Sequence, residues 1–169
     1  MEPSGIRPEP HRGPARPLRA DPLAGVPGRA EAEEALAASI ARGTRVFAAV
    51  FIVDRIHLLN DCFGYTLGDR LLGEFHERLR RRLSPTDRVF RWSGTSFVAL
   101  LEHRRAVSEV RDELELVASC DAEVTVHFGS GALALATAAS WAVFPLQGAA
   151  SKDVMVRCID HYLAANLGH

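Results

Sequence analysis

The chain has 169 residues, which is enough for one domain with a sizeable hydrophobic core and too few for two comfortable ones. Hydrophobic residues make up 47% and charged residues 24% of the chain, and the formal net charge is −1. This balance is ordinary for a globular protein, and without an overall basic field it gives no support for nucleic-acid binding. No uncharged apolar run reaches the roughly 18 residues of a transmembrane helix, so we expect no membrane insertion and a cytoplasmic location.

The first 20 residues differ in composition from the rest of the chain. They hold five of the nine prolines, together with Arg, Gly and few large apolar side chains. Such a composition favours an extended, weakly ordered segment, because it offers little apolar surface to bury. We therefore expect a tail or linker over residues 1–20 and one folded domain over residues 21–169.

Hydrophobic periodicity predicts the elements of the folded domain. Ala32, Leu36 and Ile40 recur every four residues and Gly43 follows them, which indicates a helix over 29–42. The later expected elements are a buried strand over 46–53, a short helical or irregular segment over 56–63, a helix over 66–83, strands over 87–92 and 97–101, a helix over 104–119, a hairpin of strands over 124–128 and 133–144, and a helix over 151–166. This order predicts an α+β fold in which helices cover an antiparallel-rich sheet.

The hairpin expected between the strands over 87–92 and 97–101 has an unusual tip. It reads RWSGTSF over residues 91–97, and Gly94 is the residue that we expect to accommodate the tight turn. Hairpin tips on rigid scaffolds often carry function. This tip is polar, but it offers hydroxyl groups and no carboxylate.

Four segments of the chain together resemble one known family. They read DPLAGVPGR from residue 21, FIVDRIHLLNDCFGYTLGDRLL from residue 51, SPTDRVFRWSGTSFVALL from residue 84 and ASWAVFPLQG from residue 139. In order and spacing they are similar to four blocks of the GGDEF domains, whose active members are bacterial diguanylate cyclases. The resemblance implies a palm-like sheet, related to that of nucleotidyl cyclases. It also implies a reaction that joins two GTP molecules, held by two facing subunits, into cyclic di-GMP.

The resemblance also shows which catalytic side chains are replaced. In the family, acidic residues hold two Mg²⁺ ions, which lower the pKa of the attacking hydroxyl. Here the first metal-binding Asp falls on Ile52, and the acidic third and fourth letters of the signature fall on Thr95 and Ser96. The five signature positions are Ser93, Gly94, Thr95, Ser96 and Phe97. We therefore expect no Mg²⁺ binding, no required cofactor and no cyclase activity, although Asp54, Asp87 or Glu102 would be conceivable replacement ligands.

Three further parts of the family pattern are altered. The product-binding inhibitory motif R-x-x-D reads Ser84-Pro85-Thr86-Asp87, so its Arg is lost and only the Asp is kept. The phosphate-contacting Lys of the family falls on His57. The C-terminal helix of the family is poorly kept, with Asp160 as the match to its Asp. We expect no product inhibition of the usual kind, because the guanidinium that grips the phosphate is absent.

The guanine-reading residues of the family are retained. Asn60 and Asp69 match the residues that contact the base, and Leu23 and Leu72 match apolar positions beside it. An acidic acceptor together with an amide selects guanine over adenine. The alternative is that Asn60 and Asp69 only cap neighbouring helices, as Asn and Asp commonly do.

These observations leave three hypotheses. The favoured one is a catalytically inactive GGDEF-like domain that acts as a regulatory or interaction module in bacterial signalling, through a protein partner or as a homodimer. The second is a GTP sensor that uses Asn60 and Asp69. The third, a divergent active cyclase, is opposed by Ile52, Thr95 and Ser96.

Overall fold

The computed structural model describes residues 22–118, 122–128 and 130–167; the expected tail over 1–20 and Asp21 lie outside the described residues. The helices and strands, in chain order, are α1 (Arg29–Arg42), β1 (Val46–Val53), α2 (Ile56–Phe63), α3 (Tyr65–Arg82), β2 (Arg88–Ser93), β3 (Ser96–Glu102), α4 (Val107–Ala118), β4 (Ala122–Phe128), β5 (Gly131–Thr137), β6 (Ala139–Pro145) and α5 (Lys152–Asn166). The α+β expectation is confirmed, and the irregular alternative for 56–63 is resolved as a helix.

Strand β1 lies inside the main sheet. The sheet has four strands in the order β2-β3-β1-β6, and β1 pairs antiparallel with both β3 and β6. All eight residues of β1 are buried, because each face of the sheet is covered. The continuous apolar run over 46–53 therefore forms a strand that is buried on both faces, as expected.

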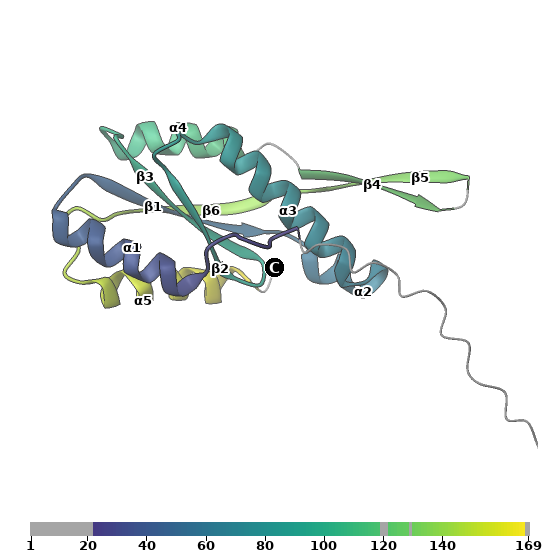
Figure 1. Ribbon diagram of the computed structural model, residues 1–169, viewed down its shortest axis with the longest axis horizontal. Helices are drawn as coiled ribbons and strands as arrows, with labels where there is room; N and C mark the ends of the chain where they lie inside the picture. Colours follow the sequence, from purple (N-terminus) through teal and green to yellow (C-terminus); the bar gives the residue numbers. More distant parts are fainter. Residues whose placement is uncertain (1–21, 119–121, 129, 168–169) are drawn as a thin grey trace, which may run out of the picture.

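Helices cover the two faces of this sheet (Figure 1). Alternate side chains of β1, from Phe47 to Val53, pack in one core with apolar residues of α3 and α4. The others, from Val46 to Ile52, pack in a second core with residues of α1 and α5. Period-two alternation in a strand places neighbouring side chains on opposite faces, and here both sets are apolar. None of the helices in the described ranges is both long and apolar enough to cross a lipid bilayer.

The expected hairpin of 124–128 with 133–144 is wrong in its second strand. The run over 133–144 is divided at Ala138 into β5 and β6, which belong to different sheets. Asp54 explains the division, because its backbone N–H donates to the Ala138 carbonyl at 3.0 Å and its carbonyl accepts from Thr137 Oγ1 at 2.5 Å. The chain is thus redirected after Thr137. Strands β4 and β5 form a two-stranded arm that projects from the body of the domain (Figure 1).

Candidate functional site

The end of β1 lies beside the tip of the β2–β3 hairpin. Ile52 is paired with Ser96 on β3 and with Ser140 on β6, and the Val53 backbone N–H donates to the Thr95 carbonyl at 2.9 Å. The fold therefore brings together the first-block and signature positions that the sequence singled out.

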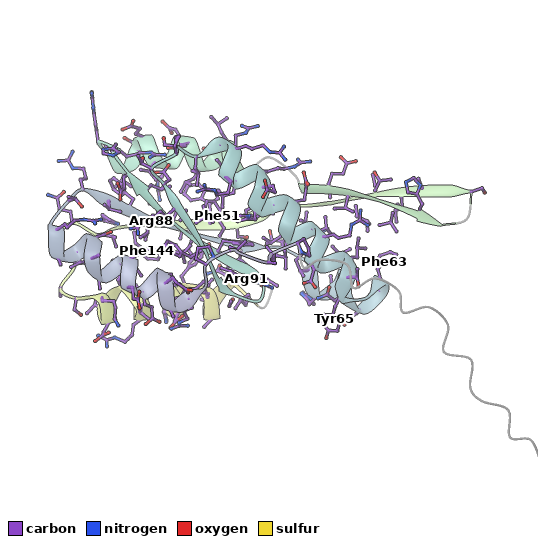
Figure 2. All side chains as sticks on the ribbon, viewed as in Figure 1. Phe51, Phe63, Tyr65, Arg88, Arg91 and Phe144 are labelled. Carbon is purple, nitrogen blue, oxygen red and sulfur yellow. The ribbon has the colours of Figure 1, made fainter. Side chains whose placement is uncertain are left out.

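The buried side of the hairpin tip carries neutral side chains. Ile52 is 3% exposed and packs in the core beneath α1 and α5. Ser96 is fully buried, and its hydroxyl lies 2.5 Å from that of Ser93, so the two hydroxyls satisfy each other. On the exposed side of the hairpin, Arg91 Nη2 donates to the Gly94 carbonyl at 3.0 Å. Figure 2 shows the Arg91 side chain beside the tip.

Gly94 does not have the role that its position suggested. Among the described glycines, a positive φ occurs at Gly25, Gly43, Gly64 and Gly148, not at Gly94. A Cβ atom built on Gly94 would meet nothing within 4 Å. The turn between β2 and β3 therefore does not need a glycine for conformational freedom, and the expectation that it does is wrong.

Asp54 is the carboxylate next to the end of β1. Its two oxygens accept from the Ser140 hydroxyl at 3.2 and 3.3 Å. Glu102 ends β3 at the opposite end of the sheet from Ser96. A magnesium ion prefers several hard, charged oxygens, and apolar Ile52 with the hydroxyls of Thr95 and Ser96 does not fit that requirement. In the described ranges, no group of three or more His, Cys, Asp and Glu side chains is placed to hold a metal ion.

Asp87, the remnant of the inhibitory motif, is a structural residue. It is 1% exposed. Its carboxylate accepts from the backbone N–H groups of Ser84 and Glu102 at 2.9 and 3.0 Å. Two further bonds come from the Arg104 guanidinium at 2.8 and 2.7 Å. These four donors occupy the carboxylate, which leaves Asp87 no free edge for a ligand.

Arg104 was not found by sequence reasoning. Besides Asp87, it binds both oxygens of Glu113 on α4, at 3.0 and 2.7 Å. The hydrogen bond with Glu113 is the largest cause of a raised Arg104 pKa; burial opposes it, and Asp87 adds to it. The triad joins the start of β2, the end of β3 and α4. No motif marks it, because its members are far apart in the sequence.

Asn60 and Asp69, the positions expected from the sequence to contact guanine, lie at the junction of α2 and α3. Asn60 Oδ1 is buried and has no hydrogen-bond partner within the described structure. It lies against Gly68, where an added Cβ would be only 2.0 Å from it. Gly68 precedes Asp69, which is half-buried. Neither residue acts as a side-chain cap for α2 or α3, whose first residues follow Arg55 and Gly64.

The remaining nucleotide-binding candidates differ in accessibility. Leu23 and Leu72 are 4% and 2% exposed and are buried in the core that α3 shares with the main sheet. His57 is exposed on the first turn of α2.

Asp160 links three segments. It accepts from Trp92 Nε1 at 2.9 Å and from both Nη atoms of Arg29 at 3.0 and 2.7 Å. Partial burial would raise the pKa of the Asp160 carboxyl, but the bonds from Arg29 and Trp92 outweigh it, and the pKa is lowered. Sequence reasoning matched Asp160 to the family without detecting this contact.

Comparison with known proteins agrees with the fold. Residues 18–164 match the family model described as "Diguanylate cyclase, GGDEF domain". The chain belongs to this family.

Individual relatives and structures give the same result. The chain is 33% identical over 128 residues to diguanylate cyclase DgcP of Pseudomonas aeruginosa, which covers 73% of this chain and 19% of that protein. Among solved structures, it resembles SiaD of P. aeruginosa, a diguanylate cyclase in complex with its activator SiaC. That match has a TM-score of 0.71, 28% identity, and coverage of 86% of this chain and 56% of SiaD.

A second structure, the coiled coil and GGDEF domain of DgcB from Caulobacter crescentus in complex with c-di-GMP, has a TM-score of 0.71 at 21% identity. It covers 88% of this chain and 81% of that one, and at this identity it shows the fold alone. The chain spans about a fifth of the length of DgcP.

Proposed function

We propose that this chain is a catalytically inactive GGDEF domain that acts as a regulatory or interaction module in cyclic di-GMP signalling. One observation carries the proposal: the end of β1 and the tip of the β2–β3 hairpin offer Ile52, Thr95 and Ser96 where the family places carboxylates. Ile52 is 3% exposed in an apolar core. In phosphoryl transfer, metal ions held by carboxylates stabilise the negative charge of the transition state, and this tip offers no carboxylate to hold them.

The surface at the α2–α3 junction supports a role in binding a protein. Leu58, Phe63 and Tyr65 are 52%, 40% and 77% exposed, and Figure 2 shows Phe63 and Tyr65 at the outer end of these helices. Exposed apolar and aromatic side chains in one place are typical of interaction surfaces. A protein partner or a second copy of the chain is therefore the expected ligand of this module.

Turnover of GTP tests the loss of catalysis. Purified protein is incubated with GTP and Mg²⁺, and the products are separated by chromatography. We expect no cyclic di-GMP, and the Asp54→Ala variant should behave in the same way. Cyclic di-GMP formed by the unmodified chain would overturn the proposal, and its loss in Asp54→Ala would identify Asp54 as a relocated metal ligand.

A guanine-nucleotide sensor is the second candidate. It is favoured by Asn60 Oδ1, a buried acceptor without a partner in the described structure, which lies against the glycine that precedes Asp69. A base that donated a hydrogen bond to this oxygen would satisfy it. The affinity would be weak, because the metals and the phosphate-contacting Lys of the family are not matched.

Calorimetric titration with GTP, with and without Mg²⁺, separates the two candidates. Binding that is lost in Asp69→Asn and kept in the matched control Asp61→Asn, an exposed carboxylate on α2, would favour the sensor. The absence of binding heat at near-millimolar GTP would exclude the sensor and favour the interaction module. Light scattering would then measure whether the chain self-associates.

A further inference from the structure

Two adjoining cavities lie at the end of the main sheet where β1 begins. Their volumes are about 580 Å³ and 310 Å³, and both are lined by Arg45, Val46 and Gln147. This region, here called the basic cleft, is formed by the turn between α1 and β1, the turn between β3 and α4, and the segment after β6. The seven steps from Val46 to Val53 place it about 23 Å from the signature hairpin.

The basic cleft carries an excess of positive charge. Arg42 ends α1, Arg45 comes from the first turn and Arg105 from the second. Glu102 is the one acidic residue among the residues that line the two cavities. Three guanidinium charges against one carboxylate leave an excess of two. Arg104 also lines the cleft, but it binds two carboxylates, those of Asp87 and Glu113, so this triad carries a net charge of −1 and lowers the excess to one.

In the described structure, each of the three guanidinium groups keeps N–H donors that no other protein group binds. Arg45 Nη1 donates to the Arg105 carbonyl at 2.8 Å, which fixes one turn to the other and leaves the remaining Arg45 donors available. Arg42 Nη2 lies 3.8 Å from Glu102 Oε1, which is a long distance for an ion pair. Within the described structure, the Arg105 guanidinium has no ion pair or hydrogen bond.

The second turn has an unusual backbone conformation and several hydrogen bonds. His103 has a φ of 64°, a left-handed conformation that non-glycine residues rarely adopt. Arg104 Nη1 holds the turn in place through the Glu102 carbonyl at 2.6 Å and through buried Asp87. A non-glycine residue kept in such a conformation by its surroundings is a common feature of ligand sites.

We propose that the basic cleft binds the phosphate group of a small phosphorylated molecule. Guanidinium forks match phosphate oxygens with two parallel hydrogen bonds, which a lysine ammonium does not reproduce. The volume suits a metabolite, because small-molecule sites typically occupy a few hundred to about 1,000 Å³. The site is independent of the proposed function, since it shares no residue with the hairpin tip or with the α2–α3 junction.

Calorimetric titration with inorganic pyrophosphate tests the site. We expect Arg105→Ala to weaken binding at least about tenfold, the effect of losing one charge-assisted contact. Arg45→Lys, which keeps the charge and loses the fork, should also weaken it. Arg111→Ala, an exposed arginine of α4 that lines neither cavity, should leave the affinity unchanged. Absence of pyrophosphate binding, or an equal loss in Arg111→Ala, would overturn the proposal.

Two further titrations identify the ligand and separate this site from the guanine-reading junction. Guanosine monophosphate that binds more tightly than inorganic phosphate would indicate a ligand with an organic body, and equal affinities would indicate free phosphate. Asp69→Asn should leave pyrophosphate binding unchanged. If Asp69→Asn loses pyrophosphate binding, the anion binds at the α2–α3 junction, and the proposal of a phosphate site in the basic cleft is wrong. Because the Arg105 guanidinium makes no bond in the described structure, its removal should leave the melting temperature unchanged.

Discussion

Trp92 on β2 donates its indole N–H to Asp160 on α5 at 2.9 Å, across 68 positions of sequence. Arg29, at the start of α1, binds the same carboxylate and lies over the Trp92 ring, with its guanidinium carbon 4.6 Å from the ring centroid. The strand that leads into the signature hairpin is thereby joined to the first and last helices. A displacement of α1 would be transmitted to this strand through Arg29.

We expect Asp160→Asn to lower the melting temperature at neutral pH and to flatten its acid dependence. The lowered pKa of Asp160 means that its contribution is present above the unfolded value of 3.8 and is lost as the pH falls through the folded value. The contribution is about 1 kcal/mol at most, because the side chain is 41% exposed. Thermal unfolding between pH 7 and pH 3 measures it. Asp153→Asn, an exposed change on the same helix, is the control, and an equal loss there would contradict the prediction.

Removal of Arg104 should destabilise the protein strongly. Arg104→Met leaves the buried Asp87 carboxylate without its cation, and an uncompensated buried charge typically costs about 3–5 kcal/mol. Urea unfolding gives the difference in free energy of unfolding. Arg111→Ala, on the exposed face of α4, should change it by less than about 0.5 kcal/mol. A cost below about 1 kcal/mol for Arg104→Met would show that the triad is not a structural centre.

The His76 imidazole should make stability depend on pH near neutrality. Burial is the largest cause of its lowered pKa, opposed by Glu77 and assisted by Arg80. The unfolded chain therefore binds more protons than the folded one as the pH falls below 6.5, and the folded state loses stability from that point downward. His76→Gln should reduce this loss between pH 6.5 and pH 5. If exposed His161→Gln reduces it equally, His76 is not the cause.

Restoring one acidic side chain to β1 should damage the fold without creating a cyclase. Ile52→Asp places a carboxylate among apolar side chains at a position that is 3% exposed, at a cost of about 3 kcal/mol or more. Ile52→Val, its apolar control, should cost about 1 kcal/mol. Chemical denaturation and a GTP assay measure both effects. A stable Ile52→Asp protein that forms cyclic di-GMP would show that the catalytic arrangement persists.

Gly68→Ala should displace the Asn60 side chain. The new Cβ would lie 2.0 Å from Asn60 Oδ1, and the amide, as the end of a flexible side chain, has to move. NMR of side-chain amides should show a shifted Asn60 signal. Gly94→Ala, where the added Cβ meets nothing within 4 Å, should leave that signal in place. An unchanged Asn60 signal in Gly68→Ala would mean that α2 and α3 are not packed so closely.

Local pattern was sufficient for the presence of the longer helices and of the interior strand β1, because their apolar periods reflect burial directly, but it left 56–63 open between a helix and an irregular segment. The helix over 29–42 has the bounds expected from Ala32, Leu36 and Ile40. The hydrophobic pattern predicted one strand over 133–144 and did not predict the break at Ala138. The division of β5 from β6 depends on Asp54, which is far away in the sequence. The spacing of the family blocks placed Ile52 beside the hairpin tip. The spacing could not predict that Arg104 binds Asp87, because the sequence does not show whether an aspartate contacts a ligand or another side chain.

The projecting arm has a consequence for how the protein behaves at high concentration. Strand β5 pairs with β4 in the described structure, and its seven residues, GALALAT, include no charge and no proline. Edge strands in natural proteins usually carry charged residues or proline, which discourage pairing with a strand of another molecule. The outer edge of β5 therefore presents backbone groups to any extended chain it meets. A lysine in place of exposed Ala134 would improve colloidal behaviour without altering the domain's core.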